Sequence, residues 1–419
     1  MAPTRPIDRA DLGTPWVRNA VAVVGGMFAT FCGYSFFVPF LALHLQDLGL
    51  SPTESAAWVG YIGFVQGVGF ATSAPLWGML ADRVGRKPMV VRAMAASSIG
   101  MLLLPLFDSA LAVLLVILVR GFLAGPGTAA VALVSAVTPR DRLAMVLGWI
   151  DASQVLGISL GLAAGGILAA TIGIQKTFVA GGCFGLLGSL LVLLMAREDF
   201  VRPEKFRGPS GRNLMRRFGG ALTQARSTLN PTIVFAFLLS SGVWMSQQGT
   251  GYIMPLRVQE IAQPGQVALF TGLAASVFAA AMFGGVLLAA RLAGRWGYRQ
   301  VLFAGLIGTT VLFLPQGLVG ELWPFMLARA LQGFCTGLVM PLGRALIAFA
   351  SDRADRGTVY GLSGVFGGVG TATGPLLYGT LLTATIGVGP AFMLGALCFL
   401  PALLSLLRRS EINALAARG

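Results

Sequence analysis

The chain has 419 residues, of which 56% are hydrophobic and only 11% are charged, and its mean hydropathy is +0.79. A soluble protein of this length would need far more charged residues to cover its surface, so the composition excludes a soluble enzyme or binding domain. The formal net charge of +14 comes from basic residues in short segments between apolar runs, which is typical of membrane topology and not of a nucleic-acid-binding face.

Twelve apolar runs reach or approach the ~20 residues that a helix needs to cross a hydrocarbon layer. They lack the two-residue alternation of membrane β-strands, so the sequence predicts an all-α membrane protein with twelve transmembrane helices. The predicted spans lie near 19–45, 56–81, 88–107, 110–136, 143–170, 173–196, 231–256, 267–290, 299–319, 322–349, 357–385 and 388–408.

A charged segment, Gly78-Met79-Leu80-Ala81-Asp82-Arg83-Val84-Gly85-Arg86-Lys87, separates the second span from the third. About 212 residues later the segment Ala290–Arg299 keeps the basic residues but has Gly294 at the position of Asp82. Two matching segments at one offset indicate a duplicated membrane protein with two homologous halves.

Four ionisable residues lie well inside the predicted spans, away from the span ends, where charge is costly and functional roles are common. They are Arg120, Asp151, Arg329 and Arg344. Asp151 is the only acidic one, and we place it about 13 Å deep in the fifth span. Arg120 lies at a similar depth in the fourth span, so a pair with Asp151 is expected. Such a pair could carry a proton during transport, or it could be a static salt bridge between helices.

Glycines repeat with one spacing in the fifth and eleventh spans, at an offset of about 213 residues. Small residues at such intervals let helix backbones approach closely, so we predict helix-packing roles for these positions. They are Gly148, Gly157, Gly161, Gly361, Gly370, Gly374 and Pro375.

The only long polar break lies between the sixth and seventh spans. It divides the chain into an N-terminal six-helix bundle (1–196), a cytoplasmic linker (197–230) and a C-terminal six-helix bundle (231–419). With both termini on the cytoplasmic side, about 25 of the 30 lysines and arginines also fall on that side. We therefore expect a multi-pass protein of a bacterial inner membrane with both termini inside.

These motifs resemble the major facilitator superfamily, and in particular its twelve-helix drug:proton antiporter branch. The segment Gly78–Lys87 resembles the family's loop motif between helices 2 and 3, the two glycine patterns resemble its antiporter motif, and Arg120 resembles its membrane arginine. Two departures weaken the likeness to drug exporters: Leu162 replaces the proline of the fifth-span motif, and the first helix lacks a buried acidic residue.

The resemblance implies that the loop motif forms a conformational gate on the inner face. Asp82 and Arg83 would latch the two halves together, with Gly357-Thr358 as a partner. The alternative is that the basic residues of the loop only fix topology and contact anionic lipid. The gate candidates are Gly78, Asp82, Arg83, Gly85, Arg86 and Lys87.

The resemblance also implies that helices 1, 4, 7 and 10 line a central cavity. Ordinary packing or lipid contact is the alternative role for each aromatic residue among the candidates. The candidates for substrate binding are Phe31, Tyr34, Phe37, Trp244, Gln247, Gln248, Tyr252, Arg329 and Gln332.

Together these features predict a secondary active transporter, not an enzyme, that works by alternating access. The first expectation is proton-coupled export of small amphiphilic or drug-like compounds. The alternatives are a transporter of an organic anion that uses Arg120 and Arg329, or a lipid-handling flippase of the same fold. The expected partners are a small-molecule substrate, protons and membrane lipid. We expect a monomer that binds no nucleic acid, metal ion or cofactor.

Overall fold

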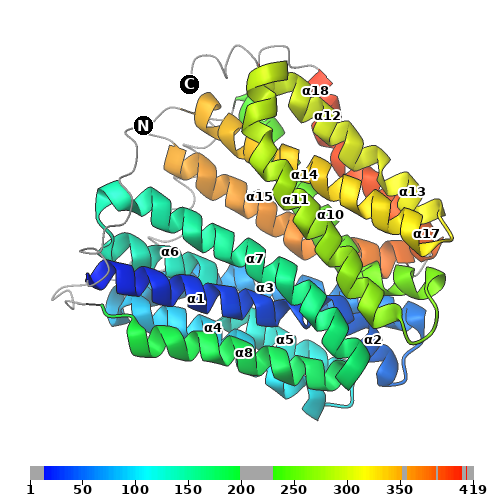
Figure 1. The fold of residues 1–419 in the computed structure, drawn as a ribbon, viewed down its shortest axis with the longest axis horizontal. Helices are drawn as coiled ribbons and strands as arrows, with labels where there is room; N and C mark the ends of the chain where they lie inside the picture. Colours follow the sequence, from blue (N-terminus) through cyan, green and yellow to red (C-terminus); the bar gives the residue numbers. More distant parts are fainter. Residues whose placement is uncertain (1–13, 199–229, 352–355, 384–385, 408–411, 413–419) are drawn as a thin grey trace. The chain divides into compact units, whose positions relative to one another are not determined.

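A computed structural model of the chain describes residues 14–198, 230–351, 356–383, 386–407 and 412. Each of the twelve predicted spans overlaps one helix or a run of consecutive helical segments (Figure 1). Eight stretches of the described residues are long and apolar enough to cross a membrane by length and composition. Within the described residues the protein is therefore an α-helical membrane protein.

The contacts divide the chain into two compact units. Unit 1 contains residues 1–49, 68–206 and 268–276, and unit 2 contains residues 50–67, 207–267 and 277–419. Each unit thus includes one helix segment from the other half of the sequence. The division into bundles of 1–196 and 231–419 remains a prediction.

Unit 1 is built around α1, which packs against α7 and α8, while α4 packs against α8 and α6 (Figure 1). Its elements are α1 (Pro15–Ser35), η1 (Val38–Phe40), α2 (Leu41–Asp47), the second part of α3 (Pro52–Val84), α4 (Arg86–Leu103), η2 (Leu104–Leu106), α5 (Ala110–Leu123), α6 (Pro126–Val137), α7 (Arg140–Ile172), α8 (Ile174–Met195) and residues Ala268–Ser276 of α11 (Val267–Trp296).

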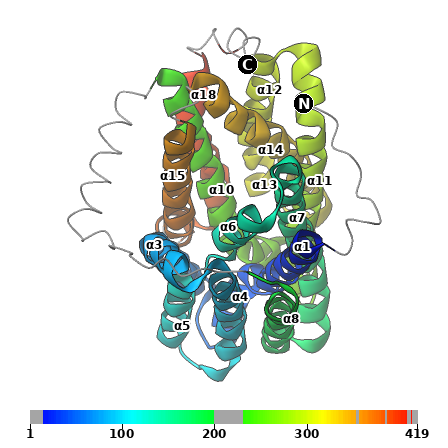
Figure 2. The same cartoon turned by 90° about the vertical axis from the view of Figure 1, so that its left-hand side faces the viewer.

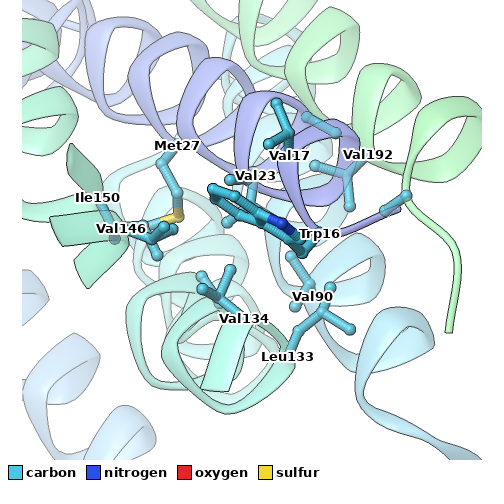
Figure 3. Close-up of a cluster of buried hydrophobic side chains, with 14 of the residues drawn as sticks. Trp16, Val17, Val23, Met27, Val90, Leu133, Val134, Val146, Ile150 and Val192 are labelled. Carbon is cyan, nitrogen blue, oxygen red and sulfur yellow. The ribbon is translucent and has the colours of Figure 1, made fainter. Parts of the chain in front are cut away.

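A cluster of buried apolar side chains joins helices of unit 1 (Figure 3). The cluster includes Trp16 of α1, Val90 of α4, Leu133 of α6, Ile150 of α7 and Val192 of α8. The side chains of the cluster come from five different helices, so their packing fixes the relative positions of these helices within the unit.

Unit 2 is built around α10, which packs against α15 and α14 (Figure 2). Its elements are the first part of α3, α10 (Pro231–Ile261), most of α11 (Val267–Trp296), α12 (Tyr298–Val311), α13 (Phe313–Leu318), α14 (Leu322–Ala350), α15 (Arg356–Leu376), the π-helix η3 (Leu377–Thr383), α17 (Val388–Leu394), η4 (Gly395–Phe399) and α18 (Leu400–Leu407).

Several helices begin at residues that satisfy their first free N–H groups. The Asn230 side chain accepts a hydrogen bond from the Ile233 N–H (2.9 Å) at the start of α10. At α3 the Glu54 carboxylate accepts hydrogen bonds from the backbone N–H and hydroxyl of Ser51, and these bonds lower the pKa of Glu54. Such reciprocal capping is a sequence-encoded helix start.

Several predicted spans contain more than one helical segment, and the runs 19–45 and 110–136 are two of them. The run 19–45 is interrupted after Ser35, where η1 separates α1 from α2. The run 110–136 is interrupted at Gly125, whose φ of +111° lies in the left-handed region that favours glycine. Pro126 follows and begins α6 with no backbone N–H to satisfy. Each of these two spans is therefore built from successive helical segments.

The two segments exchanged between the units pack through small residues. In unit 2, Gly67 of α3 lies against Ala372 of α15, and Gly63 lies against Pro375. In unit 1, Gly272 of α11 lies against Gly166 of α7. A Cβ atom at any of the three glycines Gly63, Gly67 and Gly272 would overlap its neighbour, so these close approaches require glycine.

Candidate substrate and gating sites

Arg120 occupies an aromatic site inside unit 1. It lies in the last turn of α5, just before the interruption at Gly125, and is 4% exposed. Its guanidinium carbon lies 4.6 Å from the centre of the Tyr34 ring and 5.5 Å from that of Phe37. Its Nε donates a hydrogen bond to the Ser97 carbonyl oxygen (3.2 Å). The structure therefore brings three predicted site residues together, and the aromatic rings stabilise the charge.

Asp151 lies apart from Arg120, so the expected ion pair is not formed. It is exposed on α7, whereas Arg120 faces α1 and α4. The depth of a residue along its helix gives no information on the direction of its side chain, and this explains the wrong pairing.

The direction in which the Asp151 side chain points follows from its position around α7 relative to the packed side and the exposed apolar side of this helix. Gly157 and Gly161 lie against α1, while Leu156 and Leu160 form an exposed apolar stripe. At 100° per residue, Asp151 lies on a third side, roughly opposite that stripe. An exposed carboxylate opposite a lipid-compatible face is the arrangement expected for a residue that meets water inside a membrane protein.

Arg329 lies in a neutral polar cluster inside unit 2. It is 5% exposed on α14, and its Nη1 donates to the Gln332 Oε1 (3.1 Å) and the Gln316 Oε1 (3.4 Å). Its guanidinium carbon lies 4.4 Å from the centre of the Phe278 ring. Among the described residues no carboxylate contacts it. Gln316 and Phe278 were missed from sequence, because neither lies near Arg329 in the chain.

The other predicted lining residues have separate environments. Phe31 is half-buried against the apolar cluster of unit 1, and Trp244 is 38% exposed on α10. The Gln247 Nε2 lies 3.6 Å from the sulfur of Met282. Gln248 is half-buried on the same helix.

Tyr252 is the predicted lining residue with the least exposure. It is 1% exposed, and its hydroxyl donates to the Oε1 of Gln66 (3.3 Å), a residue of α3 that the sequence analysis missed. Both lie in unit 2. This near-complete burial and the hydrogen bond to Gln66 favour a packing role for Tyr252 over contact with a solute.

The loop motif turns at Gly85, whose φ is +103°, before α4 begins at Arg86. Gly78 has no neighbour within 4 Å of a hypothetical Cβ, and Arg83 is exposed. The side chains of Asp82 and Thr358 are not among those that the structure describes. The latch between the loop motif and Gly357-Thr358 therefore stays a prediction.

A carboxylate from the start of the linker holds this loop. Glu198 accepts hydrogen bonds from the backbone N–H groups of Arg86 (2.9 Å) and Lys87 (2.7 Å). The preceding residue is held in turn: the Asn19 side chain accepts from the Arg197 N–H (2.7 Å) and donates to its carbonyl oxygen (2.6 Å). A negative group at a helix N-terminus is electrostatically favourable. Neither Glu198 nor Asn19 was predicted from sequence as a residue that holds this loop.

A cation–aromatic stack supports the same end of α3. The Arg92 guanidinium carbon of α4 lies 3.4 Å from the centre of the Trp77 ring. The Trp77 Nε1 donates to the Phe122 carbonyl oxygen of α5 (2.6 Å). Trp77 immediately precedes the loop motif, so the stack joins α3 to α4 and α5 beside it.

The repeated glycines do not all serve helix packing. Gly157 and Gly161 of α7 lie against the α1 backbone, and Gly370 and Gly374 of α15 lie against the α10 backbone. Pro375 lies against Gly63. Gly148 is exposed and has open space around it, so the structure gives it no packing role. Nothing is described around Gly361.

Within the described residues, no three His, Cys, Asp or Glu side chains are placed to hold a metal ion.

The family model of the Major Facilitator Superfamily matches residues 23–268 and 263–418. The chain belongs to the major facilitator superfamily. Its fold class is therefore that of a multi-pass transporter with twelve membrane helices in two pseudo-symmetric bundles. This agrees with the sequence-based assignment of the family.

Curated relatives and solved structures extend the comparison. The chain is 28% identical to the multidrug resistance protein MdtG of Escherichia fergusonii, over 91% of each chain. It is 29% identical to MdtG of Citrobacter koseri, over 92% of this chain and 93% of the relative.

Two solved structures share the fold at low sequence identity. The nucleoside transporter NupG matches with a TM-score of 0.72 at 13% identity, over 93% of this chain and 98% of NupG. A bacterial homologue of the human lysosomal transporter Spinster matches with a TM-score of 0.68 at 16% identity, over 97% of this chain and 98% of the homologue.

Proposed function

We propose that this chain is a secondary active transporter that exports small amphiphilic, drug-like compounds in exchange for protons. The observation that carries this proposal is its likeness to the MdtG multidrug resistance proteins over nine-tenths of both chains. It is a transporter of the family and not an enzyme. No nucleic acid is needed for this activity, and a monomer contains both halves that alternating access requires.

Asp151 is the residue proposed to bind the proton. It is the only acidic residue well inside a predicted span, and it is exposed on the side of α7 opposite the apolar stripe. A carboxylate there can exchange protons with water, because Arg120 does not neutralise it in this conformation. In this proposal Arg120 influences Asp151 only through the electrostatic field of its positive charge. The Tyr34 and Phe37 rings hold the Arg120 guanidinium in place.

The residues proposed to bind substrate are aromatic and amide residues of α1 within unit 1 and of α10 and α14 within unit 2. Tyr34 is half-buried beside Arg120, and Gln247, Gln248 and Trp244 keep part of their surface free on α10. Aromatic walls with a few orientable polar groups suit varied amphiphilic solutes.

The gate is proposed to be the loop Gly78–Lys87, whose helix start is held by Glu198. We place the protein in a bacterial inner membrane, with the loop, the linker and both termini on the cytoplasmic side. The excess of lysine and arginine in these segments supports that orientation.

The test uses purified protein in proteoliposomes with a pH-sensitive dye inside. Addition of a transported drug should move protons in the wild type. The Asp151→Asn variant should still carry the drug down its gradient but move no protons, whereas the control Asp47→Asn, at the end of α2, should behave like the wild type. Normal proton movement in Asp151→Asn would refute the coupling role.

A further inference from the structure

The charge of Arg329 has no counter-ion among the described residues of unit 2. A guanidinium remains protonated in proteins, and this one is 5% exposed. The described carboxylates of the same unit lie elsewhere: Glu260 pairs with Arg257 (2.6 Å), Glu54 caps α3, and Glu321 is exposed at the start of α14. A buried unpaired charge is costly, so the arrangement needs an explanation beyond packing.

The surroundings of Arg329 are organised to hold a cation without neutralising it. The Gln332 Nε2 donates to the Thr309 carbonyl oxygen (3.4 Å) and the Gln316 Nε2 donates to the Leu312 carbonyl oxygen (2.6 Å). Both amide groups are thereby oriented with their oxygens toward Arg329. The π face of Phe278 adds a third neutral contact. All three contacts leave the net charge of +1 in place.

The guanidinium also keeps an unused donor. Its Nε is buried and has no hydrogen-bond partner. A buried donor without an acceptor is unfavourable, and an anionic group that approached Nε would satisfy both the donor and the charge. A planar guanidinium fits a carboxylate especially well, because two parallel hydrogen bonds can form.

From these observations we infer that Arg329 is the recognition group for an anionic substrate, which would be an amphiphile with a carboxylate. This inference rests on the proposed export function and specifies the charge of the exported compounds. Because the side chain is almost fully buried here, the substrate reaches Arg329 in another conformation of the transport cycle. A permanent acidic partner would compete with such a substrate, and its absence keeps the site available.

Binding of matched acid and amide probes tests the inference. The full chain is placed in phosphatidylcholine nanodiscs, which contain no anionic lipid, and titrated with 2-naphthoate and 2-naphthamide and with decanoate and decanamide. The wild type should bind the acids at least tenfold more tightly than the amides. Arg329→Gln should lose this preference by weakening acid binding alone, and Arg329→Lys should retain part of it.

Arg344→Gln provides the matched control, because Arg344 is exposed on the same helix; it should keep the full preference. A wild type without acid preference would overturn the inference, and so would an Arg329→Gln variant that binds acids and amides equally weakly or keeps the preference. Adding phosphatidylglycerol distinguishes lipid as the source of the anion: loss of acid binding on its addition would mean that the site takes a headgroup phosphate and not a solute.

Export is measured separately from binding. If the wild type shows acid preference in nanodiscs but transports no drug in proteoliposomes, the export function fails while the anion site stands. If it transports drugs but shows no acid preference, the anion site fails alone.

Discussion

At the scale of single residues, the carboxylate of Glu198 stabilises the start of α4. It accepts from two backbone N–H groups that α4 itself cannot satisfy. We predict that Glu198→Ala lowers the free energy of unfolding by about 1–2 kcal/mol. Hydrogen exchange at the amides of Arg86 and Lys87 should accelerate in the same variant.

The neighbouring carboxylate gives the control for this prediction. Asp199→Ala should leave exchange at both amides unchanged, and Glu198→Gln should fall between the wild type and Glu198→Ala, because an amide keeps one acceptor oxygen. Equal acceleration in Glu198→Ala and Asp199→Ala would mean that a general loss of linker charge, and not the hydrogen bonds, is responsible.

Residue roles were predictable from sequence only where local chemistry was sufficient. The membrane charges Arg120, Asp151 and Arg329 could be identified, because charge is rare in apolar runs. Their partners could not: Glu198 lies more than 100 residues from the loop that it holds, and such distant contacts leave no spacing pattern. Sequence position therefore identified the ionisable groups but paired Arg120 with the wrong residue.

At the scale of elements, α15 offers a comparison of two glycines on one helix. Gly370 lies against the Ser241 carbonyl oxygen of α10, whereas Gly368 has open space around it. Gly370→Ala should lower the free energy of unfolding by about 1–3 kcal/mol, because the added methyl group forces the helices apart. Gly368→Ala should be neutral or stabilising by up to about 1 kcal/mol, since alanine favours the helix.

Thermal unfolding of both variants in the same detergent measures the difference. Similar losses of stability at the two positions would contradict the packing role of Gly370.

Helix existence was predicted well by apolar run length, but interruptions were not. Gly125-Pro126 is a pair that commonly marks a turn, so the sequence did contain a signal for the interruption between α5 and α6. The interruption after Ser35 has a weaker signal, Pro39. An apolar run is equally long whether its helix is continuous or broken, because lipid selects composition and not backbone geometry.

At the scale of the whole molecule, the bias of basic residues predicts orientation. We expect Cys introduced at Lys176, in the first turn of α8, to react with a membrane-impermeant thiol reagent in intact cells. Cys introduced at Arg295, at the end of α11, should react only after the cells are opened. The four native cysteines are replaced first. Both positions are exposed, so access depends on the side of the membrane.

Labelling of the position-295 cysteine, and not of the position-176 cysteine, in intact cells would reverse the proposed topology.

Duplication, span number and family could be predicted at this scale, because repeated motifs and run lengths extend over the whole chain. The exchange of segments of α3 and α11 between units could not, because it depends on close contacts such as that between Gly67 and Ala372.

The linker is held by hydrogen bonds at both of its ends, each within its own unit. Asn19 and the start of α4 hold Arg197 and Glu198, while the Asn230 side chain caps α10 and donates to the Ala350 carbonyl oxygen (2.7 Å). A pulling force on the middle of the linker would therefore load these hydrogen bonds before it loaded the helices that they join. The middle of the linker is accordingly the position at which a fluorescent reporter domain could be inserted with both helix ends left intact.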